Sequence, residues 1–248
     1  RVPWLVAGSA DLTDSNSIRL PEECGGVFDP GNRDGRQFYF GVREHGSAAA
    51  ANGMALSGLR PAWATFLIFS DYARPSIRLS ALMEIPTVHV FTHDSIGLGE
   101  DGPTHQPIEH LAALRAMPGL DVVRPADANE VSVCWGQVLK NASTAALALS
   151  RQGTPVIDRS EHAAAKGAAK GAYVLAESST EVPDVILVAT GTEVAIALEA
   201  RTTLEKAKIG TRVVSMPCRE WFDEQSKAYK EKVLPAAVRA RVSVEAAT

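Results

Sequence analysis

Short apolar segments alternate with longer amphipathic segments along most of the chain, and this alternation restricts the possible folds more than any other feature. In the first part, apolar runs typical of buried strands cover residues 4–7, 38–40, 62–67, 87–92, 120–124 and 146–150. Helices are expected between them, over residues 46–58, 70–83, 108–116 and 127–140. Because parallel strands need crossover connections that helices usually supply, the pattern predicts an α/β fold. Asp127 and Glu130 have the spacing of a capping box at the start of the last helix.

A change in composition near residue 160 predicts a second domain. No lysine precedes Lys140, whereas lysines are common after Lys166. The segment 163–171, rich in alanine, glycine and lysine, is typical of a linker. Beyond it, strands are expected at 172–177, 184–190, 211–217 and 241–246, and helices at 192–207 and 220–234. We therefore predict one domain over 1–162, a linker over 163–171 and a smaller α/β domain over 172–248. The expected fold is two open, mostly parallel sheets with helices on both faces.

Composition excludes several functional classes. With 46% hydrophobic and 22% charged residues, the chain is typical of a soluble globular protein. A net charge of -4 argues against nucleic acid or an anionic membrane as a partner, and no apolar run is long enough to span a bilayer. Cys24, Cys134 and Cys218 are odd in number and lie far apart, which predicts neither a disulfide framework nor a zinc site. A reducing compartment is therefore expected.

Most of the groups that could carry chemistry lie in the glycine-rich segment 92–107, THDSIGLGEDGPTHQP. It follows the expected strand 87–92, and the carboxyl ends of strands are where open α/β sheets place their sites. Its residues His93, Asp101 and His105 suit a substrate with several hydroxyls, because histidine exchanges protons near neutral pH and aspartate accepts a hydroxyl proton. No two of these possible ligands have i, i+4 spacing on an expected helix, and no CxxC-like pair occurs, so no metal site is predicted. His89 and His110 are expected to be structural.

Two further features point to a ligand, and each has a simpler explanation. Glu44 precedes a helix of small residues and could simply meet the positive end of the helix dipole. Alternatively, it is a partly buried carboxylate whose pKa is raised and which shares a proton with a ligand nitrogen. Phe66, Phe69 and Tyr72, spaced three apart, are either core residues or an aromatic shelf for a planar ring.

An anion site is suggested by Arg151, which follows the expected strand 146–150. Its planar guanidinium suits a phosphate, although a surface ion pair explains such a residue equally well. Ser15, in the irregular segment 13–37, could add a hydroxyl to the same anion.

Six segments closely resemble transketolases, and they occur in that family's order across nearly the whole chain. They are GSADLT (8–13), GVREH (41–45), TFLIFSDY (65–72), the segment 92–107, VRPAD (123–127) and LSRQ (149–152). The resemblance implies that residues 1–162 are the pyrimidine-binding domain of a thiamine-diphosphate enzyme. It also implies that residues 172–248 belong to the C-terminal transketolase domain.

The resemblance implies a role for each candidate residue. Glu44 would bond N1′ of the cofactor's aminopyrimidine, and the cofactor would act as electron sink. The pyrimidine pocket would be formed by Phe66, Phe69 and Tyr72, with Asp11 nearby. His105 would contact the transferred two-carbon unit and Asp101 the hydroxyl on the next carbon. The sugar phosphate would be held by Ser15, His93 and Arg151.

The implied reaction moves a ketol unit from a ketose phosphate, such as xylulose 5-phosphate, to an aldose phosphate, such as ribose 5-phosphate. Such transfers belong to the pentose phosphate pathway and to carbon fixation. Dihydroxyacetone synthase and deoxyxylulose-phosphate synthase have a similar fold, but the phosphate set favours the sugar-phosphate transferase. A chain that serves as a non-catalytic dimerisation or regulatory module stays an alternative, because the small-residue helix would suit that role equally well.

One departure from the family pattern concerns the diphosphate. In transketolases a preceding domain binds the diphosphate and its Mg²⁺ or Ca²⁺ through a Gly-Asp-Gly…Asn motif, which does not occur here. The cofactor of that family lies between two subunits of a homodimer. We therefore expect this chain to supply one wall of the site, and by itself neither to bind the cofactor tightly nor to turn over. We also expect the C-terminal domain to be incomplete. A cytoplasmic location is expected, with a plastid as the alternative.

Overall fold

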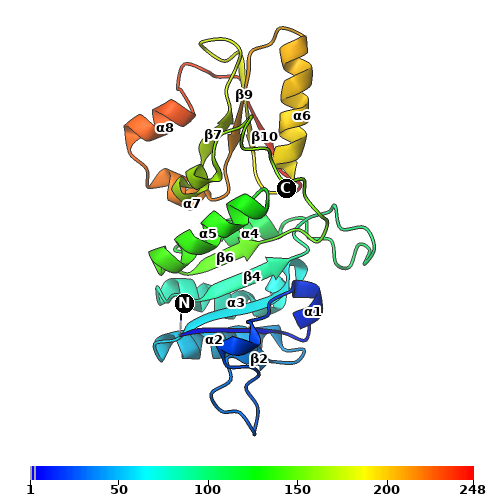
Figure 1. The fold of residues 1–248 in the computed structure, drawn as a ribbon, viewed down its shortest axis with the longest axis vertical. Coiled ribbons are helices and arrows are strands. Elements are labelled where there is room, and N and C mark those ends of the chain that lie inside the picture. Colours follow the sequence, from blue (N-terminus) through cyan, green and yellow to red (C-terminus); the bar gives the residue numbers. More distant parts are fainter. Residues whose placement is uncertain (1, 3) are drawn as a thin grey trace. The chain divides into compact units, whose positions relative to one another are not determined.

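The computed structural model describes residue 2 and residues 4–248. By its internal contacts the chain forms two compact units. The first comprises Arg1–Leu120, Asn141–Arg151 and Ala247–Thr248, and the second comprises Asp121–Lys140 and Gln152–Ala246. Figure 1 shows the elements of both units coloured along the sequence. Within the described part of the chain, no helix has the length and apolar character that crossing a membrane would require.

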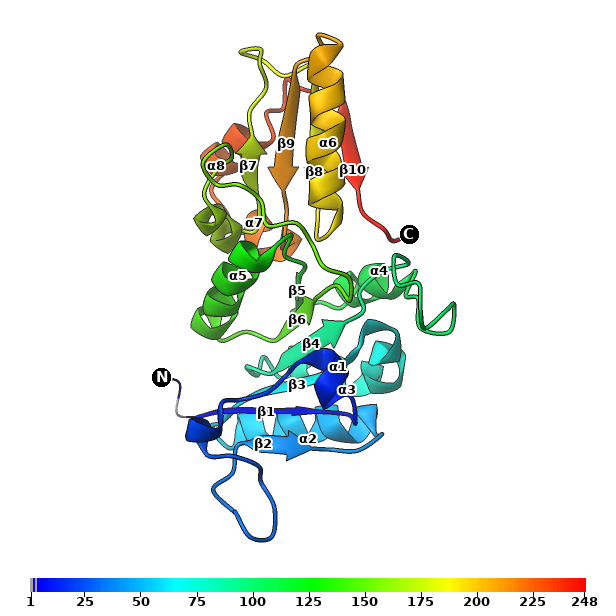
Figure 2. The ribbon, with the colours of Figure 1, turned by 45° about the vertical axis from the view of Figure 1, so that its right-hand side comes forward.

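Six strands form the first sheet, in the order β2-β1-β3-β4-β6-β5. Their bounds are β1 Leu5–Ser9, β2 Gln37–Tyr39, β3 Arg60–Phe66, β4 Val88–Thr92, β5 Asp121–Val123 and β6 Ala145–Ala148. The pairings β1–β2, β1–β3, β3–β4 and β4–β6 are all parallel. The chain passes from β1 to β2 on one side and then to β3 on the other, so the strand order reverses at β1. Figure 2 shows the arrowheads of β1, β3 and β4 directed to one edge, beside α1.

The core of the first unit is formed by the central strand β4 and by a closely packed pair of helices. Every residue of β4 is buried, as expected for a strand covered on both faces. The helices α2 (Glu44–Leu56) and α3 (Ser70–Leu82) pack against each other. Small residues of α2 such as Ala48 and Ala51 are fully buried, which permits close approach. Asn52 fixes the pair by donating to the Ser76 carbonyl at 2.8 Å.

Short elements complete the first unit. They are α1 (Thr13–Asn16), α4 (His110–Arg115) and the 3-10 turns η1 (Glu22–Cys24) and η2 (Leu67–Phe69). The segment 13–37 is otherwise irregular, as expected. His89, expected to be structural, is completely buried in β4. Its Nδ1 accepts from the Trp63 indole and its Nε2 lies 2.8 Å from the Ser80 hydroxyl. Burial lowers the pKa of His89 to about 3, so this ring is neutral.

The second unit contains a four-stranded sheet in the order β10-β8-β9-β7. Its strands are β7 Tyr173–Ala176, β8 Val185–Ala189, β9 Thr211–Ser215 and β10 Arg241–Val244. The pairings β8–β10 and β8–β9 are parallel, and β7–β9 is antiparallel. Four helices and a 3-10 turn accompany the sheet: α5 Ala128–Asn141, α6 Glu193–Lys206, α7 Arg219–Asp223, α8 Lys227–Val233 and η3 Ala165–Lys170. Figure 1 shows α6 and α8 on opposite sides of the sheet. The expected α/β fold with two mostly parallel sheets is confirmed.

One expected helix was wrong. Residues 220–234 form two helices, α7 and α8, because Ser226 caps a new helix by accepting from the backbone N–H of Tyr229. Such a side-chain cap satisfies a donor that the first turn leaves free. Residues 165–170, inside the expected linker, form η3, and Ala168 there is completely buried.

A network of buried charges lies within the second unit. Arg124 is completely buried and pairs with Glu193, and it also donates to the Thr190 carbonyl at 3.1 Å. Gly191 permits this arrangement: its φ is 55°, and a Cβ there would lie 2.6 Å from the Arg124 guanidinium carbon.

The Asp127–Glu130 pair expected as a capping box lies at the start of α5, where the Glu130 carboxylate accepts from the Ala126 N–H at 2.9 Å. The Glu130 N–H donates to the Asp127 carboxylate at 2.9 Å. The completely buried Glu130 carboxylate accepts from the hydroxyls of Tyr173 and Ser215, each at 2.7 Å. Arg124 and Asp127 of the VRPAD segment, together with Glu130, therefore make buried contacts that stabilise the second unit.

Candidate functional site

A cavity of about 500 Å³ opens in the first unit at the carboxyl ends of β1 and β3. Strands that end at the same edge, with connections leaving in opposite directions, form a crevice there. The lining residues come from the segment after β1, the start of α2, the β3–α3 connection and the loop after β4. They are Ala10, Asp11, Leu12, Val42, Glu44, Phe66, Phe69, Tyr72 and His105. Six of these were candidates from the sequence, so tertiary structure brings together residues that lie up to 94 positions apart in the chain.

Three aromatic rings form one wall of this cavity. Phe66 and Phe69 stack with centroids 5.9 Å apart and planes inclined by 12°. Tyr72 continues the row, 5.9 Å from Phe69. Phe66 is buried whereas Tyr72 is 67% exposed, so core packing explains only the inner end of the row. The outer rings present an aromatic surface to the cavity.

Glu44 is the first residue of α2 and is half-buried at the cavity wall. Its position at the helix N-terminus agrees with the simpler interpretation, a carboxylate near the positive end of the dipole. Its carboxylate, however, makes no hydrogen bond or ion pair to any of the residues that the structure describes. A partly buried carboxylate without a protein partner, opposite aromatic rings, is available to a donor on a ligand. Val42, two residues before Glu44, is 75% exposed and lines the same cavity.

His93 lies immediately after β4 and is held in an unusual conformation. Its φ is 61°, in the left-handed region that non-glycine residues seldom adopt. The ring stacks on Phe66 with centroids 3.6 Å apart, and its Nε2 lies 3.8 Å from Asp101 Oδ2. Burial lowers the pKa of His93; Asp101 opposes this shift, and Arg151 and His105 add to it. The neutral ring is therefore favoured. Asp11 also has a positive φ, 68°, and such strain is often found at functional sites.

His105 returns to the aromatic wall from the far end of the same loop. Its ring meets Phe69 edge-on with centroids 5.4 Å apart, and it lies 6.0 Å from Phe66. Nδ1 lies 2.9 Å from the Thr104 hydroxyl. The two histidines of the loop, 12 residues apart in sequence, thus contact the same phenylalanine.

Two of the three residues expected to bind phosphate, Arg151 and Ser15, lie outside this cavity. Arg151 forms an exposed ion pair with Glu100, so the surface-pair interpretation describes its contact in this structure. Ser15 is exposed on α1 and lines a second cavity of about 420 Å³. This cavity shares Asp11 and Leu12 with the first. Ser15 therefore lies beside the Glu44 cavity and does not line it.

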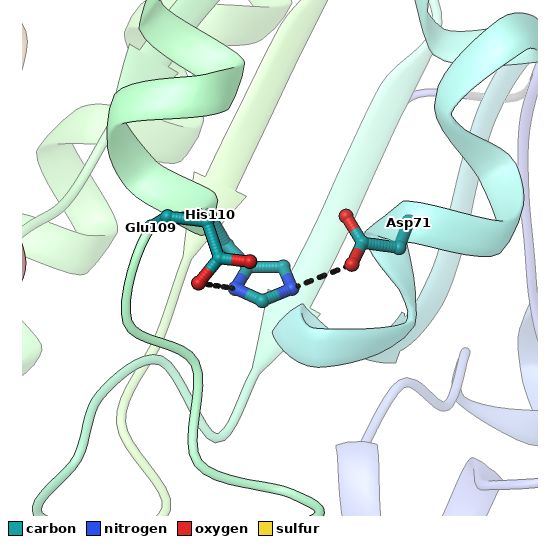
Figure 3. A group of neighbouring side chains, drawn as sticks. All are labelled: Asp71, Glu109 and His110. Atoms are coloured by element: carbon teal, nitrogen blue, oxygen red, sulfur yellow. Dashed lines mark hydrogen bonds and ion pairs between the residues drawn. The ribbon is translucent and has the colours of Figure 1, made fainter.

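His110, expected to be structural, is buried between two carboxylates (Figure 3). Its Nε2 bonds Asp71 Oδ2 at 3.1 Å, and Nδ1 lies 3.8 Å from Glu109 Oε2. One ligand atom from each residue lies within 4.8 Å of the others, a grouping that could in principle hold a metal ion. Because the carboxylates face different ring nitrogens, a single ion could coordinate His110 through only one of them. The arrangement suits a bridge from α4 to the start of α3, next to Tyr72.

Three polar residues at this edge were missed by sequence reasoning. Glu100 contacts Arg151. Its position next to Asp101 in the glycine-rich loop could have identified it as a candidate. Thr92 contacts His93 Nδ1 at 2.9 Å and is its chain neighbour. Asn16 contacts Thr92 from 76 positions away, and no local pattern indicates that contact.

Comparison with known families and proteins agrees with this architecture. Residues 1–156 match the family model "Transketolase, pyrimidine binding domain", and residues 171–248 match "Transketolase-like TK C-terminal domain". The chain is 53% identical to "Transketolase" from Rhodobacter capsulatus over 248 residues, which is 99% of this chain and 36% of that protein. It thus spans little more than a third of such relatives.

Solved structures give the same result. A Pichia stipitis transketolase crystallised with sedoheptulose 7-phosphate is 42% identical, with a TM-score of 0.92; the match covers 99% of this chain and 36% of that one. A structure described as "Split gene transketolase, inactive beta4 tetramer" is 26% identical, with a TM-score of 0.73. That match covers 98% of this chain and 73% of the other.

Proposed function

Because the chain belongs to the transketolase family, we propose that it forms the pyrimidine-binding side of a thiamine-diphosphate-dependent active site. The reaction is transfer of a two-carbon ketol unit from a ketose phosphate to an aldose phosphate. The observation that carries this proposal is a cavity lined by three aromatic rings, His105 and the Glu44 carboxylate, which has no partner among the described residues. A flat, polar-edged ring such as an aminopyrimidine matches that combination of walls.

The residues of the cavity fit the cofactor's ring portion. Phe66, Phe69 and Tyr72 would hold the faces of the ring, and Glu44 would bond a ring nitrogen. When bound, thiamine diphosphate supplies a carbon nucleophile and an electron sink for the sugar's carbonyl carbon. Glu44 contributes by holding a proton at that ring nitrogen, which a half-buried carboxylate can do because few waters compete for it. The aromatic wall excludes water from the same space.

The histidines and Asp101 would face the sugar. His105, edge-on to the aromatic wall, would contact the two-carbon unit, and Asp101 would accept from the hydroxyl of the next carbon. His93, beside Asp101, and Arg151 would bind the phosphate end, with Ser15 approaching from the adjoining cavity. Arg151 would have to leave Glu100 to do so.

The diphosphate and its divalent ion would be held by a region beyond these 248 residues, on the same polypeptide or on a second subunit. The short span of the match to the relatives supports this, and so does the split-gene structure, which this chain covers far more completely. A homodimer would form the complete enzyme, and we propose a cytoplasmic location. The 248-residue chain alone should bind thiamine diphosphate and magnesium weakly. Isothermal titration checks this, and micromolar affinity would contradict it.

The decisive experiment assays the chain together with the diphosphate-binding part. Ketol transfer from xylulose 5-phosphate to ribose 5-phosphate is expected, and Glu44→Gln should reduce it by about 10²–10⁴-fold, the usual contribution of a proton-transferring group. Glu199→Gln, an exposed change on α6, is the matched control and should retain the activity. Normal turnover by Glu44→Gln would refute the role of Glu44. Activity only with formaldehyde as acceptor, or only with pyruvate as donor, would replace the proposed reaction.

A further inference from the structure

A buried row of hydrogen bonds leads from β1 to the ring of His93. The Ser9 hydroxyl donates to Asn16 Oδ1 at 2.6 Å, and Asn16 Nδ2 donates to Thr92 Oγ1 at 2.7 Å. Thr92 Oγ1 in turn lies 2.9 Å from His93 Nδ1. All four side chains are buried, so water does not compete for these groups.

The direction of the row follows from the lengths of its bonds. At 2.6 Å, the contact from Ser9 to Asn16 has the length of an O–H···O bond, whereas the Ser9 hydroxyl lies 3.2 Å from the Ala64 carbonyl. The Ser9 proton therefore belongs to Asn16 Oδ1, and the Asn16 amino group must face Thr92.

The same reasoning places the proton of Thr92. A hydroxyl has one proton and can accept other bonds through its lone pairs. Since Thr92 Oγ1 accepts from Asn16, its own proton is directed to His93 Nδ1, the other partner that the described residues give it. Nδ1 is then an acceptor, and the neutral ring carries its proton on Nε2.

We propose that Asn16 is a positioning residue which, through Thr92, holds His93 as the Nε2–H tautomer and so directs a hydrogen-bond donor to the edge of the site. Nε2 faces Asp101, an acceptor, at 3.8 Å. The two side chains together offer one donor and one acceptor, which matches a sugar hydroxyl, whereas a phosphate oxygen would accept from Nε2–H alone. Only the identity of that ligand depends on the proposed function; the position of the proton follows from the row itself.

Nuclear magnetic resonance of the ligand-free chain, with ¹⁵N-labelled histidine, tests the proposal. Long-range ¹H–¹⁵N correlations show which ring nitrogen carries the proton, at a pH where His93 is neutral. The wild type is expected to carry it on Nε2. In Asn16→Asp the carboxylate can only accept, so it takes the Thr92 proton, Thr92 accepts from Nδ1–H, and the tautomer reverses.

Two further variants serve as controls. Asn52→Asp makes the same change at another buried amide, which bonds Ser76 and Thr87, and should leave His93 unchanged. Thr92→Ser keeps the hydroxyl and should keep the Nε2–H tautomer.

Three outcomes would overturn the proposal: a proton on Nδ1 in the wild type, no reversal in Asn16→Asp, or a reversal in Asn52→Asp. The wild-type spectrum decides even where Asn16→Asp does not fold. Because the spectrum needs no ligand and no turnover, failure of the ketol-transfer assay leaves this assignment standing, and the reverse also holds.

Discussion

Charged side chains occur in two contrasting settings in this chain. In the first unit Glu44 faces a cavity and has no partner among the residues that the structure describes, and Arg151 pairs with Glu100 at the surface. In the second unit Arg124 and Glu130 are completely buried and bond several groups each. Glu44, Arg151 and Arg124 lie in segments that resemble the same family. The charged groups of the first set are therefore available to a ligand, whereas those of the second set are already hydrogen-bonded within the protein.

The largest expected effect concerns the buried arginine. Arg124→Met should lower the free energy of unfolding by about 3–5 kcal/mol, because it leaves the buried Glu193 carboxylate without its cation. Urea unfolding followed by circular dichroism measures this. Arg151→Met, the exposed counterpart, should cost less than about 1 kcal/mol. An equal decrease in the free energy of unfolding for the two variants would contradict the distinction between the buried and the exposed arginine.

A smaller effect is expected when a buried carboxylate becomes an amide. Glu130→Gln should cost about 1–3 kcal/mol, since an amino group would replace an oxygen that accepts from Tyr173 or Ser215. Glu44→Gln at the cavity should stay within about 0.5 kcal/mol of the wild type, because no residue in the described part of the chain donates to its carboxylate. The same unfolding measurement compares them. A larger loss for Glu44→Gln would indicate a structural role for Glu44.

The exposed pair predicts a modest gain in affinity. Glu100→Gln removes the carboxylate that competes with phosphate for Arg151. An exposed pair contributes about 0.2–1 kcal/mol, so the KM for ribose 5-phosphate should fall by less than about fivefold. Unphosphorylated ribose is the control substrate and should show no change. A fall of the same size with ribose would place Arg151 away from the phosphate.

The smallest expected effect is a shift in titration. His93 should titrate below 6.5, because burial lowers its pKa more than Asp101 raises it. The neutral ring therefore adds stability above pH 6.5, and this contribution is lost as the pH falls through the folded pKa. Asp101→Asn should lower the midpoint further and Arg151→Met should raise it, measured from the ring proton signals. A midpoint at or above 6.5 would contradict the effect of burial.

Much of the architecture follows from local sequence patterns. The strands, the helices up to residue 207 and the Asp127–Glu130 pair at the start of α5 depend on periodicity and on residues a few positions apart. The split of α7 from α8 was missed because Ser226 is a polar residue whose capping role depends on the turn around it. The contact of Arg151 could not be predicted, because an arginine at this position can bind either a phosphate or a surface carboxylate. Only the folded loop brings Glu100 close to it.

Sequence alone determined the alternating α/β order, the family resemblance and the set of residues that could carry chemistry. These features depend only on residue types and on short spacings along the chain. Tertiary structure decided which of those residues share a cavity, which charges are sealed in the second unit, and that Asn16 reaches Thr92 beside His93. The physical reason is that burial and hydrogen-bond direction arise where distant segments meet, and the proton of His93 depends on both.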